Sequence, residues 1–529
     1  MARSKMALAV IWVSVGVGVM LGLWQRVAAR TTGPIRTFAV VAAGLVVALS
    51  LLPHAIASEG LAGLCVALAS VAFIPALERV VRVPFRKVNA EGLRLELGFA
   101  GLLVHRFGDG VVMAVEGHGH ELSWAVGAHE IPIVALVTLA YARRGLGPAL
   151  VRATLLGLTS SIGLWAVRAM PGAWHDLHGW VDAIAAGILV HILAYEALPE
   201  TLETPRERAS DGLGALLGLS IVLWPSFEEQ PEVPNVARSV LVAALHAAPF
   251  LLLGLAASAA LLSYRGRSGL GRPPEGVGAG RPWPALEAFT LAAGYLGWVL
   301  AGGYWLAASL LSRLGTSEVR RLSPPTALDT QPAASASRGF WPTLEGLVLR
   351  VGGWIGVGLL AATYVESFSP PGQPLLGLGL GARALFVVAL AIPASVCSAG
   401  AVPIASALVA KGLSPLLAVA GLTLGAVLSD ALGSLSRAGV GSRRGLRELA
   451  PLAFAGLGVA LGLDAIFPTT GAFEAPGAAV GAIEWAAFAG LVALGARSVW
   501  RVGIRGWLGS SLQALGPLTR RQAAHAHAH

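Results

Sequence analysis

The sequence predicts an all-α fold, a polytopic bundle of transmembrane helices, from three observations. Hydrophobic residues make up 55% of the chain and charged residues only 13%, whereas soluble domains carry about 25% charged residues. The mean hydropathy is +0.70. Apolar segments long enough to cross about 30 Å of hydrocarbon recur about fifteen times along the chain. Because lipid offers the backbone no hydrogen-bond partners, these segments are predicted to be helices.

The first half of the chain is predicted to hold eight helices. The apolar run after Lys5 ends near Trp24 without a convincing signal-peptide cleavage site, so it is expected to be the first helix. Basic clusters follow the first, third, fifth and seventh spans and mark cytoplasmic loops, at residues 26–36, 79–94, 143–152 and 206–208. Both ends of the bundle then lie outside, although Arg3 favours the cytoplasm for the N-terminus. This topology, and not nucleic-acid binding, explains the formal charge of +9.

A stretch rich in proline and acidic residues at 228–235 divides the chain. We expect one transmembrane domain at 1–228, a second transmembrane domain at 236–507 and a flexible cytoplasmic tail at 508–529. The Ala-His repeats of this tail have two interpretations, a low-complexity segment or a weak metal-binding tract, and we favour the first.

The second half is predicted to contain seven spans, some with uncertain topology. They are expected near residues 236–264, 286–311, 344–366, 382–410, 413–435, 447–467 and 479–500. Basic loops flank 286–311 on both sides and also follow 413–435. Basic loops are expected on the cytoplasmic side only, so this pattern does not fit spans that cross the membrane one after another. Either segment is therefore a candidate re-entrant hairpin, with Gly302–Gly303 as the turn of the first.

Ionisable residues gather in two neighbouring spans, and at membrane depth such residues are costly enough to mark a functional site. His105 and Asp109 are four residues apart, so they lie on one face of a helix. The next span carries His129 and Glu130, followed by Pro132, which is expected to kink the helix. Two imidazoles and two carboxylates suit Zn²⁺, and Fe²⁺, Mn²⁺ or Co²⁺ also fit. We therefore predict a divalent metal site between these helices.

Arg106 supplies a competing interpretation of the same cluster. Its guanidinium is able to pair with Asp109 or Glu130, and such salt bridges would hold the helices together without any metal. The metal hypothesis requires the predicted ligands to converge, with the guanidinium outside the space between them. A metalloprotease site is excluded, because its motif needs a second histidine four residues after His129, where the chain has Ile133.

Four sequence elements resemble those of the ZIP family of metal transporters. Residues 105–110, His-Arg-Phe-Gly-Asp-Gly, are similar to the family's His-Asn-x-x-Asp-Gly element, and residues 129–132, His-Glu-Ile-Pro, to its His-Glu-x-Pro element. Residues 51–54, Leu-Leu-Pro-His, resemble the end of the family's second helix. Residues 187–200, which end Leu-Pro-Glu, resemble its seventh helix. Together these elements extend the resemblance over residues 1–230.

The resemblance implies an eight-helix fold with a metal path between the fourth and fifth helices, leading towards the cytoplasm. It places the four predicted ligands at the ligand positions of the family. Arg106 stands where the family usually has Asn, and Ile133 where it usually has an acidic or His ligand. Because a fixed positive charge repels a neighbouring cation, these departures predict one bound metal, and Arg106 is also able to plug the pathway.

Two outer loops are expected to carry further histidines. His118 and His120 lie between the fourth and fifth spans, and His175 and His178 lie in another loop on the same side. Such side chains collect metal at an entrance by weak, exchangeable ligation. They also occur as ordinary solvated loop residues, and the sequence leaves both interpretations open.

The most informative segment of the second half is 392–403, Ile-Pro-Ala-Ser-Val-Cys-Ser-Ala-Gly-Ala-Val-Pro. Pro393, Gly400 and Pro403 predict a broken helix, and broken helices at the midplane are where transporters commonly bind substrate. Cys397 either ligates a soft ion or simply packs. Asp430, in the next span, is either a proton or cation relay or a helix-terminal residue near the interface.

This segment resembles the Pro-x-Cys-Ser-Cys-Gly-x-x-Pro element of a bacterial permease family that includes exporters of organic arsenicals. Residues 411–414, Lys-Gly-Leu-Ser, resemble the Lys-Gly-x-Ser turn that follows it. The similarity covers mainly residues 344–435, and residues 236–264 show a weaker similarity to the same family. Ala399 replaces the family's second Cys, so a two-thiolate grip on a trivalent metalloid is not available and no substrate is implied.

The sequence therefore predicts a fusion of two transport modules and not an enzyme. The first module is expected to move a divalent metal ion, Zn²⁺ before others, across a bacterial inner membrane. Its partners are the lipid bilayer and the metal ion, with no nucleic acid and with a homodimer left open. One competing interpretation is a non-transporting metal sensor or scaffold that supports the permease half. Another is that the second half alone exports a solute and the first half is a relic.

Overall fold

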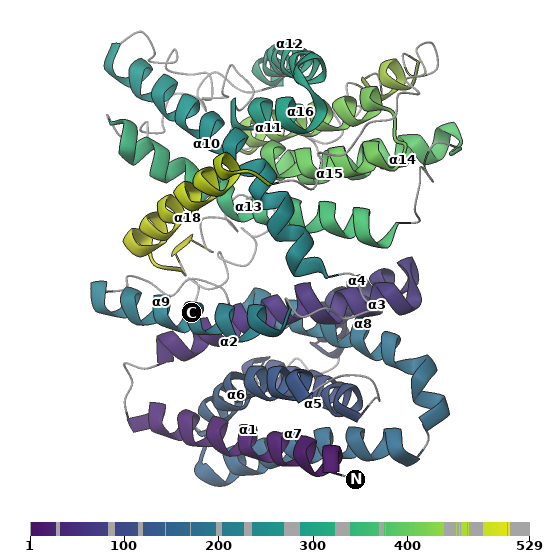
Figure 1. The fold of residues 1–529 in the computed structure, drawn as a ribbon, viewed down its shortest axis with the longest axis vertical. Coiled ribbons are helices and arrows are strands. Elements are labelled where there is room, and N and C mark those ends of the chain that lie inside the picture. Colours follow the sequence, from purple (N-terminus) through teal and green to yellow (C-terminus); the bar gives the residue numbers. More distant parts are fainter. Residues whose placement is uncertain are drawn as a thin grey trace. The chain divides into compact units, whose positions relative to one another are not determined.

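The computed structural model is helical wherever it describes regular structure (Figure 1). The described residues are 2–27, 32–82, 90–114, 120–142, 144–169, 171–196, 204–226, 235–268, 286–322, 339–369, 375, 377–437, 451, 454, 456–462, 464, 480–504 and 506–507. Within these ranges there is no strand. The predicted all-α class is thereby confirmed, whereas the predicted tail at 508–529 lies outside the described residues.

The chain divides into two compact units, and each is described by itself. Unit 1 contains Met1–Arg238 and Trp500–Gly506, and unit 2 contains Ser239–Val499 and Trp507–His529. The division after Arg238 lies close to the proline-rich stretch at 228–235. Residues Trp500–Gly506, which were predicted to be part of the second domain, group with unit 1.

Unit 1 is a bundle of helices in which partners far apart in sequence pack side by side. The main pairs are α1 with α6, α5 with α7, α2 with α9, and α4 with α8. The helices are α1 (Ala2–Val27), α2 (Thr32–Val46), the π-helical turn η2 (Val47–Leu51), α3 (Leu52–Glu59), α4 (Leu61–Arg82), α5 (Ala90–Ala114), α6 (His120–Ala142), α7 (Leu146–Ala169), α8 (Pro171–Glu196) and α9 (Pro205–Ser226).

Local signals in the sequence explain several of these helix ends. Gly60 and Gly145 adopt positive φ angles of 62° and 130°, a conformation that glycine tolerates best, and they separate α3 from α4 and α6 from α7. At the start of α9, the Thr204 amide donates to Glu207 Oε2 (2.7 Å) and the Glu207 amide donates to Thr204 Oγ1 (3.3 Å). This is a capping box, and Pro205 follows at the first helical position, where its missing N–H costs nothing.

Glycines bring α5 and α7 into direct backbone contact. A Cβ added at Gly110 of α5 would collide with the carbonyl oxygen of Ser160, and one added at Gly163 of α7 would collide with that of Phe107. Small residues allow such close approach of helices. The two helices therefore touch beside the turn of α5 that carries His105 and Asp109.

Unit 2 is built around one large apolar core that draws on helices from α10 to α16. Its helices are α10 (Val236–Ser268), α11 (Leu286–Leu296), α12 (Trp298–Leu322), α13 (Phe340–Phe368), α14 (Leu380–Val396), α15 (Ser398–Ala410), α16 (Pro415–Arg437) and α18 (Ala482–Val502). The pairs α14 with α16, α13 with α15, and α12 with α16 form most of the packing.

The predicted turn at Gly302–Gly303 is wrong. The break lies at Gly297, whose φ of 85° ends α11 and lets α12 begin at Trp298. α12 then runs without interruption through Gly302 and Gly303, where an added Cβ would meet nothing within 4 Å. A glycine pair breaks a helix only where the backbone adopts a conformation closed to other residues. The second hairpin candidate, 413–435, is occupied by the continuous helix α16.

Six helices in the described residues are long and apolar enough to cross a membrane. They are Met6–Trp24, Val40–Glu59, Leu146–Ala169, Val236–Tyr264, Phe340–Phe368 and Ala482–Val502. Large apolar side chains on them face outward, among them Trp165 with 68% of its surface exposed. Outward-facing apolar side chains on spanning helices suit a lipid environment. The structure thus supports a multi-pass membrane protein, and the count of eight spans in the first half stays a prediction.

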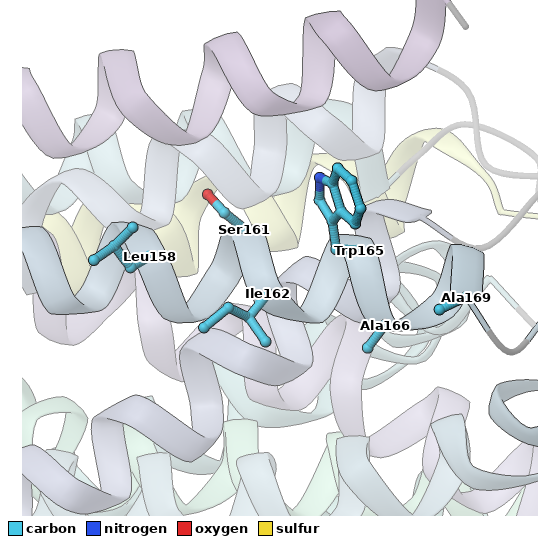
Figure 2. A pocket seen from close by; sticks show the side chains of 6 residues that line it. All are labelled: Leu158, Ser161, Ile162, Trp165, Ala166 and Ala169. Carbon is cyan, nitrogen blue, oxygen red and sulfur yellow. The ribbon is translucent and has the colours of Figure 1, made fainter.

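A shallow apolar hollow on α7 illustrates this lipid-facing character (Figure 2). Its lining residues all lie on that one helix, namely Leu158, Ser161, Ile162, Trp165, Ala166 and Ala169. The Ser161 hydroxyl donates to the Gly157 carbonyl oxygen at 2.8 Å, so the helix satisfies this group itself. The hollow presents no converging polar groups and is not a candidate site.

We expect Gly110→Ala to destabilise unit 1 by about 1–3 kcal/mol, because the new methyl group forces α5 away from α7. Gly212→Ala is the matched control, since a Cβ at this position of α9 meets nothing within 4 Å, and it should be neutral or slightly stabilising. Thermal unfolding of the detergent-solubilised protein measures both variants. Equal midpoints for the two would contradict the close approach.

Candidate functional site

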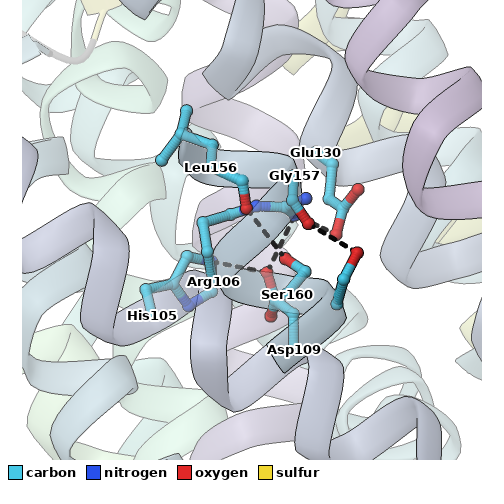
Figure 3. A network of polar contacts seen from close by, with 8 residues as sticks. His105, Arg106, Asp109, Glu130, Leu156, Gly157 and Ser160 are labelled. Atoms are coloured by element: carbon cyan, nitrogen blue, oxygen red, sulfur yellow. Dashed lines mark hydrogen bonds and ion pairs between the residues drawn. The ribbon is translucent and has the colours of Figure 1, made fainter. Parts of the chain in front are cut away.

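One turn of α5 places three ionisable side chains inside unit 1 (Figure 3). His105 and Arg106 are wholly buried, and Asp109 is 4% exposed. The spacings of three and four residues bring Arg106 and His105 each beside Asp109 on the helix surface. The cluster therefore forms within one helix before any neighbour contributes.

The Arg106 guanidinium joins α5 to α6. Its Nη1 atom lies 3.2 Å from Asp109 Oδ2 and also forms an ion pair with Glu130 Oε1, from the buried middle of α6. His105 Nε2 lies 3.4 Å from the same Asp109 oxygen. Figure 3 shows the guanidinium between the two carboxylates. A buried charge of either sign needs such partners, because desolvation alone would cost several kcal/mol per ion.

This arrangement matches the salt-bridge interpretation of the cluster. His105, Asp109 and Glu130 do converge, but the Arg106 guanidinium occupies the space between the carboxylates, which the metal hypothesis required to be open. Within the described residues, no group of three or more His, Cys, Asp or Glu side chains is arranged to hold a metal ion. In this conformation Arg106 is the cation of the site, and a metal would have to displace it.

The remaining predicted residues of this site lie on α6. His129 belongs to α6, and its side chain lies outside the described part of the structure. Ile133 is buried in the apolar core of unit 1 with Val134 and Val137. An apolar side chain at this position adds no ligand, and the prediction of one bound metal stays a prediction.

Sequence reasoning missed a third carboxylate beside the cluster. Asp182 of α8 is 4% exposed and lies close enough to Asp109 for their charges to interact. In the sequence, Asp182 is a single acidic residue within an apolar segment. Because it lies on a different helix from His105 and Asp109, residue spacing could not link it to them. Asp109 and Glu130 already outnumber Arg106, and Asp182 adds a third buried acid, so the cluster favours binding of further positive charge.

The histidines predicted in outer loops are placed differently by the structure. His120 is the first residue of α6, and His175 and His178 lie in the first turns of α8, so the prediction of loop positions is wrong for these three. Proline is favoured at the first helical position, and Pro171 starts α8 earlier than the apolar pattern indicated. Their side chains, and all of His118, lie outside the described residues.

The predicted broken helix in unit 2 is present. α14 ends at Val396, Cys397 is extended with φ −152° and ψ 106°, and α15 begins at Ser398. The Gly400 amide donates to Cys397 Sγ at 3.4 Å, so the thiol caps α15. A Cβ added at Gly358 of α13 would collide with the Gly400 carbonyl oxygen. The break is therefore packed directly against the backbone of α13.

The other residues predicted at the break are helical. Pro393 lies inside α14, where its carbonyl oxygen accepts the Cys397 amide at 2.9 Å, and Pro403 lies inside α15. Asp430 belongs to α16, and its side chain is outside the described residues. The two roles considered for Asp430 stay predictions.

No family model, no curated protein and no solved structure matches the chain. The resemblances to ZIP transporters and to the permease family therefore rest on the motifs at 51–54, 105–110, 129–132, 187–200 and 392–414.

We expect Glu130→Leu to destabilise unit 1 by about 1–3 kcal/mol, because Arg106 loses its partner on α6 and keeps only Asp109 of its own helix. Combining it with Arg106→Met and Asp109→Leu should recover most of this loss, since apolar side chains then replace the whole buried ionic network. Unfolding in detergent measures both variants, with Arg168→Met on the exposed end of α7 as control. If the triple variant loses more than the single one, the buried ion pairs are not what limits the stability of this contact.

Proposed function

We propose that the chain is a membrane transporter whose first unit moves a divalent metal ion, Zn²⁺ before others, past His105, Asp109 and Glu130. In this proposal, Arg106 holds the carboxylates as a tethered cation while no metal is bound. A metal ion entering the site takes the carboxylates, and the guanidinium moves away. The metal is the substrate, and no covalent chemistry is involved.

The observation that carries this proposal is the position of the Arg106 guanidinium between Asp109 and Glu130. A guanidinium and a metal ion compete for the same carboxylates, and two cations a few ångströms apart repel strongly in a buried site. Within the described residues, Nε and Nη2 of Arg106 make no hydrogen bond. Displacing the guanidinium therefore breaks few interactions besides the two ion pairs.

The chemistry of the cluster supports a divalent transition metal as substrate. An imidazole with carboxylates is a ligand set that Zn²⁺ accepts readily. The excess of buried acids over Arg106, which Asp109 and Glu130 create and Asp182 increases, favours a doubly charged ion over a singly charged one. The ZIP-like motifs support the same substrate and a path towards the cytoplasm.

A second candidate function follows from the same contact. If the Arg106 pairs are permanent, unit 1 is a sealed, non-transporting scaffold or sensor that supports unit 2, and unit 2 transports a solute past the break at Cys397. The specific observation that favours it is the pairing of one guanidinium with carboxylates of both α5 and α6.

Metal uptake into vesicles that contain the purified protein separates the two candidates. Arg106→Asn removes the competing cation, so the transporter hypothesis predicts zinc uptake about tenfold or more above the unaltered protein, as Coulomb repulsion in a buried site is relieved. His105→Ala should reduce uptake to the level of empty vesicles. Arg168→Asn, an exposed change at the far end of α7, is the control and should leave uptake unchanged.

The opposite results would favour the scaffold. Zinc uptake at the background level in both the unaltered protein and Arg106→Asn, with bound zinc absent after dialysis, would contradict the transport proposal. Uptake that does not respond to His105→Ala would show that any zinc flux bypasses this site.

A further inference from the structure

A second ionic network lies on α5, about ten residues before the buried cluster. Glu96 Oε1 lies 3.3 Å from Arg144 Nη1, in the turn after α6, and Glu96 Oε2 lies 2.8 Å from Arg152 Nη2 in α7. One carboxylate thus joins α5 to the ends of two neighbouring helices. The basic loops at 79–94 and 143–152 indicate that this end of the bundle faces the cytoplasm.

Two buried aromatic rings lie beneath this network. Phe99 and Tyr141 are 4% and 2% exposed, and their ring centroids are 5.8 Å apart in an edge-on arrangement. The Arg152 guanidinium lies 4.8 Å from the Phe99 centroid and 5.2 Å from that of Tyr141, while that of Arg144 lies 5.6 Å from Tyr141. These are cation–π distances, so the arginines hold both rings in place.

The rings stand between the network and the buried cluster. Phe99 and Arg106 are seven residues apart, which places them on the same face of α5, and Leu102 lies between them in the apolar core. At 1.5 Å per residue, the height from Glu96 to Arg106 is about 15 Å. The Tyr141 hydroxyl also donates to the Leu95 carbonyl oxygen at 3.4 Å, which ties the ring of α6 to the backbone of α5.

We infer that Glu96, Arg144 and Arg152 form a cytoplasmic latch that keeps Phe99 and Tyr141 closed over the path from the buried cluster. The role of the latch in closing a metal path rests on the proposed function. Whether the latch covers the buried residues can be tested without measuring transport. The latch side chains are 32–43% exposed, and ion pairs in such positions are weak and screened by salt. Weak, exposed ion pairs suit a contact that must open and close. The buried ion pairs of Arg106 differ, because in the proposed function they open only when another cation replaces the guanidinium.

Thiol labelling at Leu102 tests the latch in the full-length protein. The background is Cys65→Ser with Cys397→Ser, the reporter is Leu102→Cys, and a membrane-impermeant maleimide is added on the cytoplasmic side of vesicles. We expect Glu96→Gln to raise the labelling rate about fivefold, the effect of losing weak ion pairs. Glu59→Gln, at the end of α3, is the control and should leave the rate unchanged.

A second reporter keeps the result from being confused with general unfolding. Leu164→Cys, buried in α7 at 2% exposure, should stay protected in the Glu96→Gln variant. Labelling of Leu102→Cys at the same rate with and without Glu96→Gln would overturn the latch, and so would loss of protection at both reporters. If labelling behaves as expected but no variant takes up zinc, the proposed function fails while the latch stands.

Discussion

The central constraint on unit 1 is that a fully buried arginine must keep its charge neutralised. Hydrocarbon and packed side chains offer a guanidinium no solvation, so in this conformation Asp109 and Glu130 neutralise it. This requirement fixes α5 against α6 even though these two helices share little other packing. The stronger neighbours of α5 are α7 and α8, which position the acidic turn without contributing to the ion pairs.

The same electrostatics link the architecture to the proposed transport. A cluster with more carboxylates than arginines attracts cations, and the arginine supplies a charge that never leaves the protein. Selectivity then depends on whether an incoming ion interacts with imidazole and carboxylate more favourably than the guanidinium does. Doubly charged ions that accept nitrogen and oxygen ligands meet this condition better than alkali ions do.

Helix positions and the acidic cluster could be predicted from the sequence because both depend on local spacing. Hydropathy located the helices, and the four-residue interval placed His105 beside Asp109. The sequence named Asp109 and Glu130 as alternative partners of Arg106, but it could not predict that the guanidinium pairs with both, since this depends on how α6 is rotated against α5. Asp182 was missed for the same reason, because its helix is separated from α5 in sequence and meets it only through tertiary packing.

The helix break in unit 2 shows how backbone geometry limits what sequence patterns reveal. Two prolines and a glycine at 393–403 located that break, whereas Gly302–Gly303, a glycine pair without proline, continues a helix. At the true break, Gly358 and Gly400 allow the main chains of α13 and α15 to touch. With no side chain between them, these two glycines set how closely α15 can approach α13, and a larger residue at either position would push the start of α15 away from its neighbour.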